Sequence, residues 1–371
     1  MAKADFGAIV PECLKNLAPY VSGRLIEDVL EEMGLESAVK LASNENSLGP
    51  SPKALEAVAK ALTGLNRYGD ADSRRMRSAI AQKTGHPVEG IIAGNGSSEF
   101  VLIMAHALLG PGLRAVMSKP SFTLYAKNAQ AAGAEVVELP LTPAHGHDMK
   151  AIKKAANGQT RLVFIDNPLN PTGAWLTPQE IGDLALSIPD SALLVLDEAY
   201  VDFARSPRPD YQALLAGGKV AIIRTFSKIY GLAGLRAAYA LMAPELAQAL
   251  NKARQPFNVN NLAQAAIMGA LSDTEHLERT LSMTWGALDR LGRELPPLGL
   301  TPHPTEANFL MARLPGRLGA DQLMGALLKE GVIIRSLSSF GLPSHIRINA
   351  GTDSELGALL SALAKALPGL S

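Results

Sequence analysis

Apolar and polar positions alternate in blocks between about residue 90 and residue 226. Short apolar runs are separated by longer stretches with helical spacing. This pattern predicts strands over 90–94, 114–118, 134–140, 160–166, 191–199 and 219–226, and helices over 97–110, 122–133, 147–158 and 177–188. Strands separated by helices form a parallel sheet that is covered on both faces, and the nearly continuous apolar runs 162–165 and 193–196 favour burial on both sides.

The pattern changes after residue 244. It predicts long helices over 244–253, 260–271 and 274–294, then short strands over 307–314, 331–336 and 345–350 with helices over 319–330 and 353–366. The fold class we expect is α/β: a large domain with a mostly parallel sheet between helices, joined through a long helix to a smaller C-terminal α+β domain. We place the large domain at 46–255 and the small one at 256–371, after an N-terminal segment of residues 1–45.

Composition and charge exclude several classes of protein. The 371 residues contain 35 Lys and Arg against 35 Asp and Glu, a balance that argues against nucleic acid or an anionic membrane as the main partner. Cys13 is the single cysteine, so no intramolecular disulfide can form, and we expect a cytoplasmic protein. His145 and His147 resemble a pair of metal ligands, but no third ligand is evident, so we expect a solvated loop and no metal site.

One lysine lies where active sites form in α/β proteins. The segment TFSKIYGLAGLR follows an apolar strand and presents Ser227, Lys228 and Arg236 in a glycine-rich loop. Burial and nearby cations would lower the pKa of the Lys228 amine and make it a nucleophile, while Ser227 and Arg236 could bind a phosphate. The alternative is a solvated lysine beside a surface arginine.

Two other loops also follow buried strands. Asp197 ends an apolar strand in LDEAY, and a buried carboxylate there needs a cationic partner such as a protonated pyridine nitrogen. Tyr200 and, in the rigid loop DNPLNPTG, Asn170 could hydrogen-bond a ring oxygen. The alternatives are a structural cap or salt bridge for Asp197 and a plain turn for the asparagine loop.

The earliest loop of the sheet suits a single phosphate. In GNGSSE the glycines allow close approach and Ser97 and Ser98 open a helix, whose N-terminus favours an anion. A dinucleotide fingerprint fails because Glu99 stands at its third glycine position. Phe122 begins the next helix and could stack on a flat ring, or could be a core residue. Together, the order of these groups predicts a pyridoxal phosphate site.

The same motifs carry a family resemblance. The opening APYVSGRLIEDVLEEMGLESAVKLASNENSLGPSPKAL, followed by NRYGD, GNGSSE, DNPLNPTG, LDEAYVDF, RTFSKIYGLAGLR, ANFL, GVIIR and HIRINAG, resembles the fold-type I pyridoxal-phosphate aminotransferases, and more closely the histidinol-phosphate aminotransferases. This resemblance implies pyridoxal 5'-phosphate as cofactor and a ping-pong transfer of an amino group between L-histidinol phosphate and 2-oxoglutarate or glutamate. An aromatic amino-acid aminotransferase and a phosphothreonine decarboxylase of the same fold remain alternatives.

The resemblance also implies roles for residues. Lys228 would bond the cofactor and move the proton, Asp197 would pair with the ring nitrogen, Tyr200 and Asn170 would bond the ring hydroxyl, and Phe122 would stack on the ring. The cofactor phosphate would bind Ser97, Ser98, Ser227, Arg236 and, from the partner subunit of a homodimer, Tyr68. Substrate anions would bind Arg347, Arg335 and Tyr20, with the N-terminal segment packed near the active site.

Overall fold

In the computed structural model, which describes residues 5–19, 23–208 and 210–370, seven strands form the main sheet. Their order across the sheet is β2-β8-β7-β6-β5-β3-β4. The strands are β2 (Ile91–Gly94), β3 (Arg114–Lys119), β4 (Glu135–Pro140), β5 (Thr160–Asp166), β6 (Leu193–Asp197), β7 (Val220–Thr225) and β8 (Ala238–Leu241). Every neighbouring pair from β7 to β4 is parallel, whereas β8 runs antiparallel to both β2 and β7. The expected mostly parallel sheet is therefore confirmed.

The antiparallel strand β8 was not predicted. Its sequence is AYAL, and alanine has low strand propensity, so neither alternation nor a β-branched run marks it. The chain reaches it directly from the loop after β7, without a crossover helix, as an antiparallel return allows. Because β8 lies between β7 and β2, it brings the loop after β2 to the same end of the sheet as the lysine loop.

Helices cover both faces of this sheet. The helices are α4 (Pro52–Ala61), α5 (Arg74–Thr84), α6 (Ser97–Leu108), α7 (Leu124–Ala131), α8 (Met149–Ala155), α9 (Pro178–Ser187), α10 (Gln212–Ala216), α11 (Pro244–Asn251) and α12 (Asn261–Leu271). Alternate strand residues explain the two layers: Met117 and Phe164 pack with α6, α7 and α11, whereas Val116 and Val163 pack with α5, α8, α9, α10 and α12.

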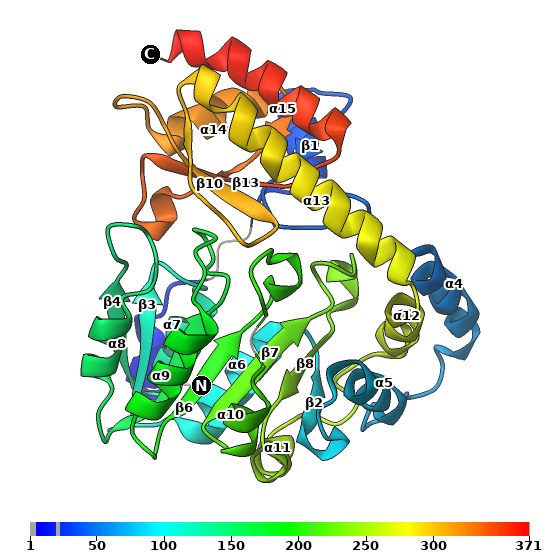
Figure 1. Ribbon diagram of the computed structural model, residues 1–371, viewed down its shortest axis with the longest axis vertical. Coiled ribbons are helices and arrows are strands. Elements are labelled where there is room, and N and C mark those ends of the chain that lie inside the picture. Colours follow the sequence, from blue (N-terminus) through cyan, green and yellow to red (C-terminus); the bar gives the residue numbers. More distant parts are fainter. Residues whose placement is uncertain (1–4, 20–22, 209, 371) are drawn as a thin grey trace.

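A second unit lies beyond the carboxyl ends of the parallel strands of the main sheet (Figure 1). Its four-stranded antiparallel sheet has the order β12-β13-β10-β9 and carries three helices. The elements are β9 (Thr301–Pro302), β10 (Phe309–Arg313), β12 (Arg335–Ser336), β13 (His345–Asn349), α13 (Thr274–Glu294), α14 (Ala320–Lys329) and α15 (Asp353–Ala366). The run 331–336, predicted as one strand, forms β11 (Val332–Ile333) and β12, because β11 pairs instead with β1 (Val39–Lys40).

Helix α13 joins the two units. Leu277 and Leu281 in its first half pack against the core of the large sheet, while Ala287 and Leu291 in its second half belong to the core of the small unit. The domain limits 46–255 and 256–371 remain a prediction. The packing of α12 within the core of the large sheet favours a boundary inside α13.

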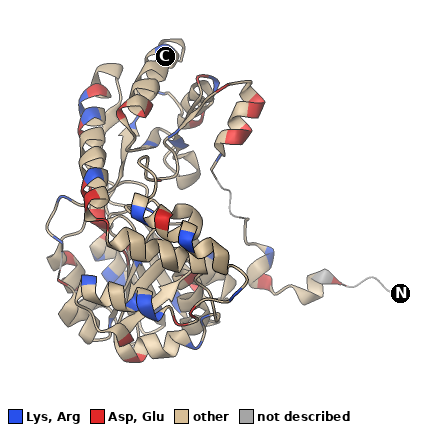
Figure 2. Ribbon diagram, turned by 90° about the vertical axis from the view of Figure 1, so that its right-hand side faces the viewer, with Lys and Arg blue, Asp and Glu red and all other residues tan. Residues whose placement is uncertain are grey.

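The N-terminal segment contains α1 (Phe6–Ile9), α2 (Glu12–Lys15) and α3 (Ile26–Met33). The first two helices project from the body of the molecule, and positively and negatively charged residues are interspersed along the rest of the chain (Figure 2). The Cys13 Sγ approaches the Ala131 carbonyl oxygen at 3.5 Å, so this segment contacts the end of α7. Among the described residues, no helix is long and apolar enough to cross a membrane.

The close contact between α12 and α4 depends on a residue without a side chain. A Cβ at Gly269 would overlap the Lys53 carbonyl oxygen, whereas a Cβ at Gly286, on the exposed side of α13, would meet nothing within 4 Å. We expect Gly269→Ala to lower Tm in calorimetry through a loss of about 1–3 kcal/mol from overpacking. The control Gly286→Ala should raise Tm through a gain of up to about 1 kcal/mol in helix propensity. Equal effects of the two substitutions would contradict this account of the contact.

Candidate active site

The largest group of predicted site residues lines one cavity, of about 540 Å³, at the carboxyl ends of the main strands. Parallel strands place the loops that follow them at a common edge, where ligands bind in α/β proteins. The cavity is lined by Ser43, Glu45, Ser97, Ser98, Phe122, Leu124, Tyr125, Asp166, Asn170, Asp197, Ala199, Tyr200, Thr225, Ser227, Lys228, Ala233 and Arg236. Residues from five separate loops thus meet here as the sequence predicted.

Lys228 lies three residues beyond the end of β7, with its amine inside the cavity. The Nζ donates a hydrogen bond to the Ser43 carbonyl oxygen at 3.1 Å and lies 5.6 Å from the centre of the Tyr200 ring. Burial lowers the pKa of Lys228 to about 8, and the nearby Arg347 lowers it further than Glu45 raises it. About a tenth of the amine is therefore neutral, and nucleophilic, at pH 7, far more than for a lysine with the ordinary pKa.

Asp197 presents a carboxylate to the same cavity from the end of β6, and it is 5% exposed. Oδ2 accepts a hydrogen bond from the Tyr125 hydroxyl at 2.8 Å, and Oδ1 accepts one from the Ala199 amide at 3.1 Å. Both donors are neutral. Burial raises the pKa of Asp197 to about 6 in spite of these bonds. A cationic group in the cavity would stabilise this charge, as a ring nitrogen carrying a proton would.

A second carboxyl group lies directly beside the first. Asp166 ends β5 and pairs in register with Asp197 across the sheet. Its Oδ2 accepts a hydrogen bond from the Asn170 amide at 2.9 Å, and burial raises its pKa well above the usual range. A neutral Asp166 leaves Asp197 as the carboxylate that a cationic ligand would meet.

One end of the cavity is built for an anion. Helix α6 begins at Ser97 and directs free backbone N–H groups at the cavity, beside the side chains of Ser98 and Ser227. The Arg236 Nη1 lies 3.5 Å from the Ser227 Oγ. A Cβ at Gly96, whose φ is +77°, would overlap the Arg236 guanidinium, so glycine is required for this approach. Together, the hydroxyls, the helix end and the guanidinium can hold a phosphate.

A second cavity of about 360 Å³ adjoins the first and shares Phe122, Asn170, Tyr200 and Lys228 with it. It adds two arginines from the small unit, Arg335 and Arg347. Arg347 is 6% exposed and holds the two units together: Nη1 donates to the Asn170 Oδ1 at 2.5 Å, and Nη2 to the Ala42 carbonyl oxygen at 2.8 Å. Arg335 lies over the Phe340 ring. The arginines make this cavity suitable for an anionic substrate.

Among the described residues, one predicted site residue lines neither cavity. Tyr68 is 85% exposed and stacks on Phe257 at 4.7 Å, so it does not reach the cavities of its own chain. Tyr20 lies outside the described residues. The neighbouring Ala18, Pro19 and Gly23 line the second cavity.

Three residues of the site were not singled out from the sequence. Tyr125 lies three residues after Phe122 at a helix position typical of a core aromatic, although its hydroxyl donates a hydrogen bond to Asp197. Asp166 ends an apolar strand, as Asp197 does, and that shared position was the available signal. Asn44, whose Nδ2 donates to the Tyr200 hydroxyl oxygen at 3.0 Å, comes from irregular chain that carries no periodic pattern.

The chain matches known proteins over nearly its whole length. Residues 36–363 match the family "Aminotransferase class I and II". The chain is 41% identical over 367 residues to histidinol-phosphate aminotransferase 2 of Pseudomonas fluorescens, covering 98% of each chain. It is 40% identical to histidinol-phosphate aminotransferase of Desulfotalea psychrophila, covering 98% of this chain and 96% of that one.

Among solved structures, histidinol-phosphate aminotransferase from Sinorhizobium meliloti, in complex with pyridoxal-5'-phosphate, matches with a TM-score of 0.90. The two sequences are 28% identical, and the match covers 98% of each chain. Both the fold class and the predicted family are confirmed by these matches. The chain belongs to the family of class I and II aminotransferases.

Proposed function

We propose that this chain is a pyridoxal-phosphate-dependent histidinol-phosphate aminotransferase that transfers an amino group between L-histidinol phosphate and 2-oxoglutarate. The observation that carries the proposal is one cavity in which a lysine of lowered pKa, a buried carboxylate and an anion pocket converge. The substrate assignment is supported by full-length relatives near 40% identity that bear this name.

The residues of the cavity fit pyridoxal phosphate. The helix end at Ser97 with Arg236 suits its phosphate, and Asp197 suits a protonated ring nitrogen. Phe122 lines the same cavity, where it can stack on a flat ring. When bound, the cofactor supplies an electron sink for the electrons released at the substrate's α-carbon.

Side chains of this protein bind and orient the cofactor and the substrate. The neutral Lys228 amine is placed to bond the cofactor and to take and return a proton at the substrate's α-carbon. The Tyr200 hydroxyl is fixed by Asn44, and the Asn170 side chain is fixed by Arg347, so both can position a ring oxygen. The buried Asp197 holds positive charge on the ring throughout the cycle.

Two different anions must use the second cavity in a ping-pong reaction. Histidinol phosphate carries a phosphate and no carboxylate, whereas glutamate carries two carboxylates. A guanidinium binds either group through two parallel hydrogen bonds, so Arg347 and Arg335 can serve both half-reactions. Tyr20 stays a proposed contact to the substrate phosphate.

We further propose a homodimer, in which the exposed Tyr68 reaches the cofactor phosphate of the partner subunit. The exposed stack of Tyr68 on Phe257 supports this role, because large aromatic side chains at a surface favour an interface. We place the enzyme in the cytoplasm, since its single cysteine suits a reducing compartment.

The lysine is the most direct test of the chemistry. We expect Lys228→Ala to reduce turnover by at least about 10³-fold, because the proton-transferring amine is lost. The matched control, Lys150→Ala, changes an exposed lysine of α8 and should keep wild-type turnover. Circular dichroism and Tm establish that both variants are folded. Normal turnover by folded Lys228→Ala would exclude the proposed mechanism.

The substrate is tested in a half-reaction. L-histidinol phosphate is added to the cofactor-loaded protein without a keto acid, and the visible absorbance of the cofactor is followed, with phenylalanine in parallel. Fast loss of the band at low histidinol phosphate and slow loss with phenylalanine is expected. The reverse preference would favour an aromatic amino-acid aminotransferase, and release of carbon dioxide from phosphothreonine would favour a decarboxylase.

The pH dependence of cofactor loading reports on Lys228. Only the neutral amine attacks, so the rate at which the cofactor-free protein takes up pyridoxal phosphate should rise with pH, with a midpoint near 8. Arg347 disfavours the protonated amine, so Arg347→Gln should move the midpoint to higher pH. Stopped-flow absorbance measures both curves. A midpoint near the ordinary lysine value in the wild type would contradict the role of burial.

A further inference from the structure

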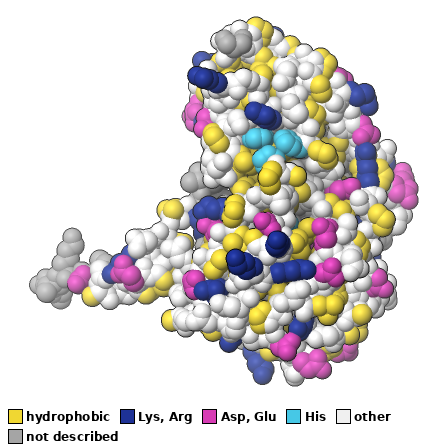
Figure 3. Space-filling model, turned by 60° about the vertical axis from the view of Figure 1, so that its left-hand side comes forward, with side chains coloured by type: hydrophobic (Ala, Val, Ile, Leu, Met, Phe, Trp, Pro, Cys, Tyr) yellow, Lys and Arg dark blue, Asp and Glu magenta, His cyan; other side chains and the backbone are white. Residues whose placement is uncertain are grey.

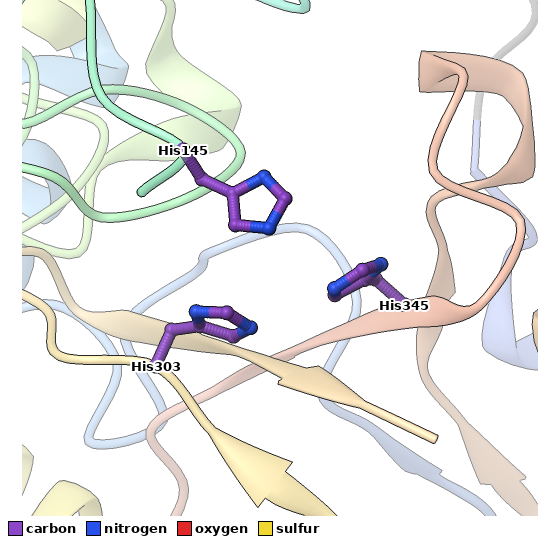
Figure 4. A group of neighbouring side chains, drawn as sticks. All are labelled: His145, His303 and His345. Carbon is purple, nitrogen blue, oxygen red and sulfur yellow. The ribbon is translucent and has the colours of Figure 1, made fainter. Parts of the chain in front are cut away.

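Three of the seven histidines meet at the boundary between the two units, outside both cavities that contain Lys228. One ring nitrogen from each of His145, His303 and His345 lies within 4.8 Å of the other two. The ring centres are 5.0, 5.1 and 5.5 Å apart, so the three rings form a nearly equilateral triangle. Figure 4 shows the rings turned toward a common point. Figure 3 shows histidine side chains together at the surface of the molecule.

Two of these rings bury nitrogens that lack a partner. His345 is 7% exposed, and its Nδ1 lies 3.3 Å from the Ser344 Oγ. Its Nε2 and the Nε2 of His303 are buried, and neither finds a hydrogen-bond partner among the residues that the structure describes. Burying a polar nitrogen without a partner costs free energy, so this arrangement calls for a ligand that accepts nitrogen lone pairs.

We propose that His145, His303 and His345 form a binding site for a divalent transition-metal ion, represented in the test by Zn²⁺. Imidazole is a preferred ligand of zinc, copper and nickel, and three histidines leave the fourth position of a tetrahedral site to water. A Zn–N bond is about 2.0–2.1 Å long, which places tetrahedral ligands about 3.4 Å apart. Side-chain rotations that bring the nitrogens closer together by up to about 1.4 Å would complete the site. The Ser344 contact can orient the His345 ring, as outer partners of zinc-bound histidines do.

The neighbouring His147 takes no part in this site. Its Nδ1 lies 2.7 Å from the Ser118 Oγ and its Nε2 lies 2.9 Å from the Asp166 carbonyl oxygen, so both nitrogens are engaged in the core. The sequence places His145 and His147 together, but the structure turns them to different surroundings. The missing ligands come from residues that lie more than 150 positions further along the chain.

An ion at this point would join the two units. His145 lies in the loop between β4 and α8 of the large unit, whereas His303 follows β9 and His345 begins β13 in the small unit. Alternate residues of a strand share a face, so His345 lies on the same face of β13 as Arg347. The ion would therefore hold the strand that carries Arg347 against the large unit.

Zinc binding to the cofactor-loaded protein tests the proposal. After removal of metals by a chelator, isothermal titration calorimetry should give one zinc ion per wild-type chain, and saturating zinc should raise Tm. His145→Asn and His303→Asn should each weaken binding by at least about 10-fold. The matched control His106→Asn changes an exposed histidine of α6 and should bind zinc as the wild type does.

The choice of His145→Asn separates loss of the site from loss of the fold. His145 has a φ of +60°, a backbone conformation that asparagine accepts more readily than most residues do, so this variant should fold. Circular dichroism checks that it does. Zinc binding of equal affinity in wild type and folded His145→Asn would overturn the proposal, as would the absence of saturable binding to the wild type at micromolar zinc.

Discussion

A carboxylate buried at the end of a strand is the constraint on which this site depends. Asp197 lies at the carboxyl end of β6 with 5% of its surface exposed, and burial raises its pKa to about 6. Its two hydrogen bonds, from Tyr125 and Ala199, come from neutral groups and do not restore the usual value. A cation in the cavity would stabilise the charged form. The aminotransferase chemistry that we propose supplies that cation as a protonated ring nitrogen.

Burial in the same cavity shifts the pKa of Lys228 in the opposite direction. Lys228 also loses solvation, but its pKa falls, because burial disfavours the charged form of any group. The cavity therefore contains an acid whose pKa has risen and an amine whose pKa has fallen, and the two values approach each other near neutral pH. An amine whose pKa lies near neutral pH can take and return a proton at little cost, as proton transfer at a substrate carbon requires. A solvated lysine on a surface loop, the alternative drawn from the sequence, has neither property.

The sequence predicts the half of the site that the large sheet builds. Most of the predicted strands are followed by a candidate site residue, so Asp197, Asn170, Ser97 and Lys228 converge once the strands are parallel. Asp166 was missed although it shares its strand-end position with Asp197, and the register of the two strands places the two carboxyl groups side by side. Tyr125 was missed because a core aromatic shows no polar role until its hydroxyl meets Asp197. Strand β8 was missed because alanine-rich AYAL carries no strand signal, and its place between β7 and β2 is a property of the whole sheet. The histidine triangle shows the same limit, since His145 and His345 are brought together only by the docking of one unit on the other.

The contact between the two units also brings an arginine of the small unit, Arg347, to the candidate active site. Arg347 belongs to the small unit, yet its guanidinium bonds Asn170 and Ala42 of the large unit and the N-terminal segment. Its positive charge lowers the pKa of Lys228, so the reactivity of the amine depends on how the small unit sits. His345 lies two residues away on the same face of β13, where it faces His145 of the large unit. The position of a single strand therefore affects the protonation of the lysine, and in the proposed function it would also govern the binding of the substrate anion, so a ligand that fixes this strand would act on both.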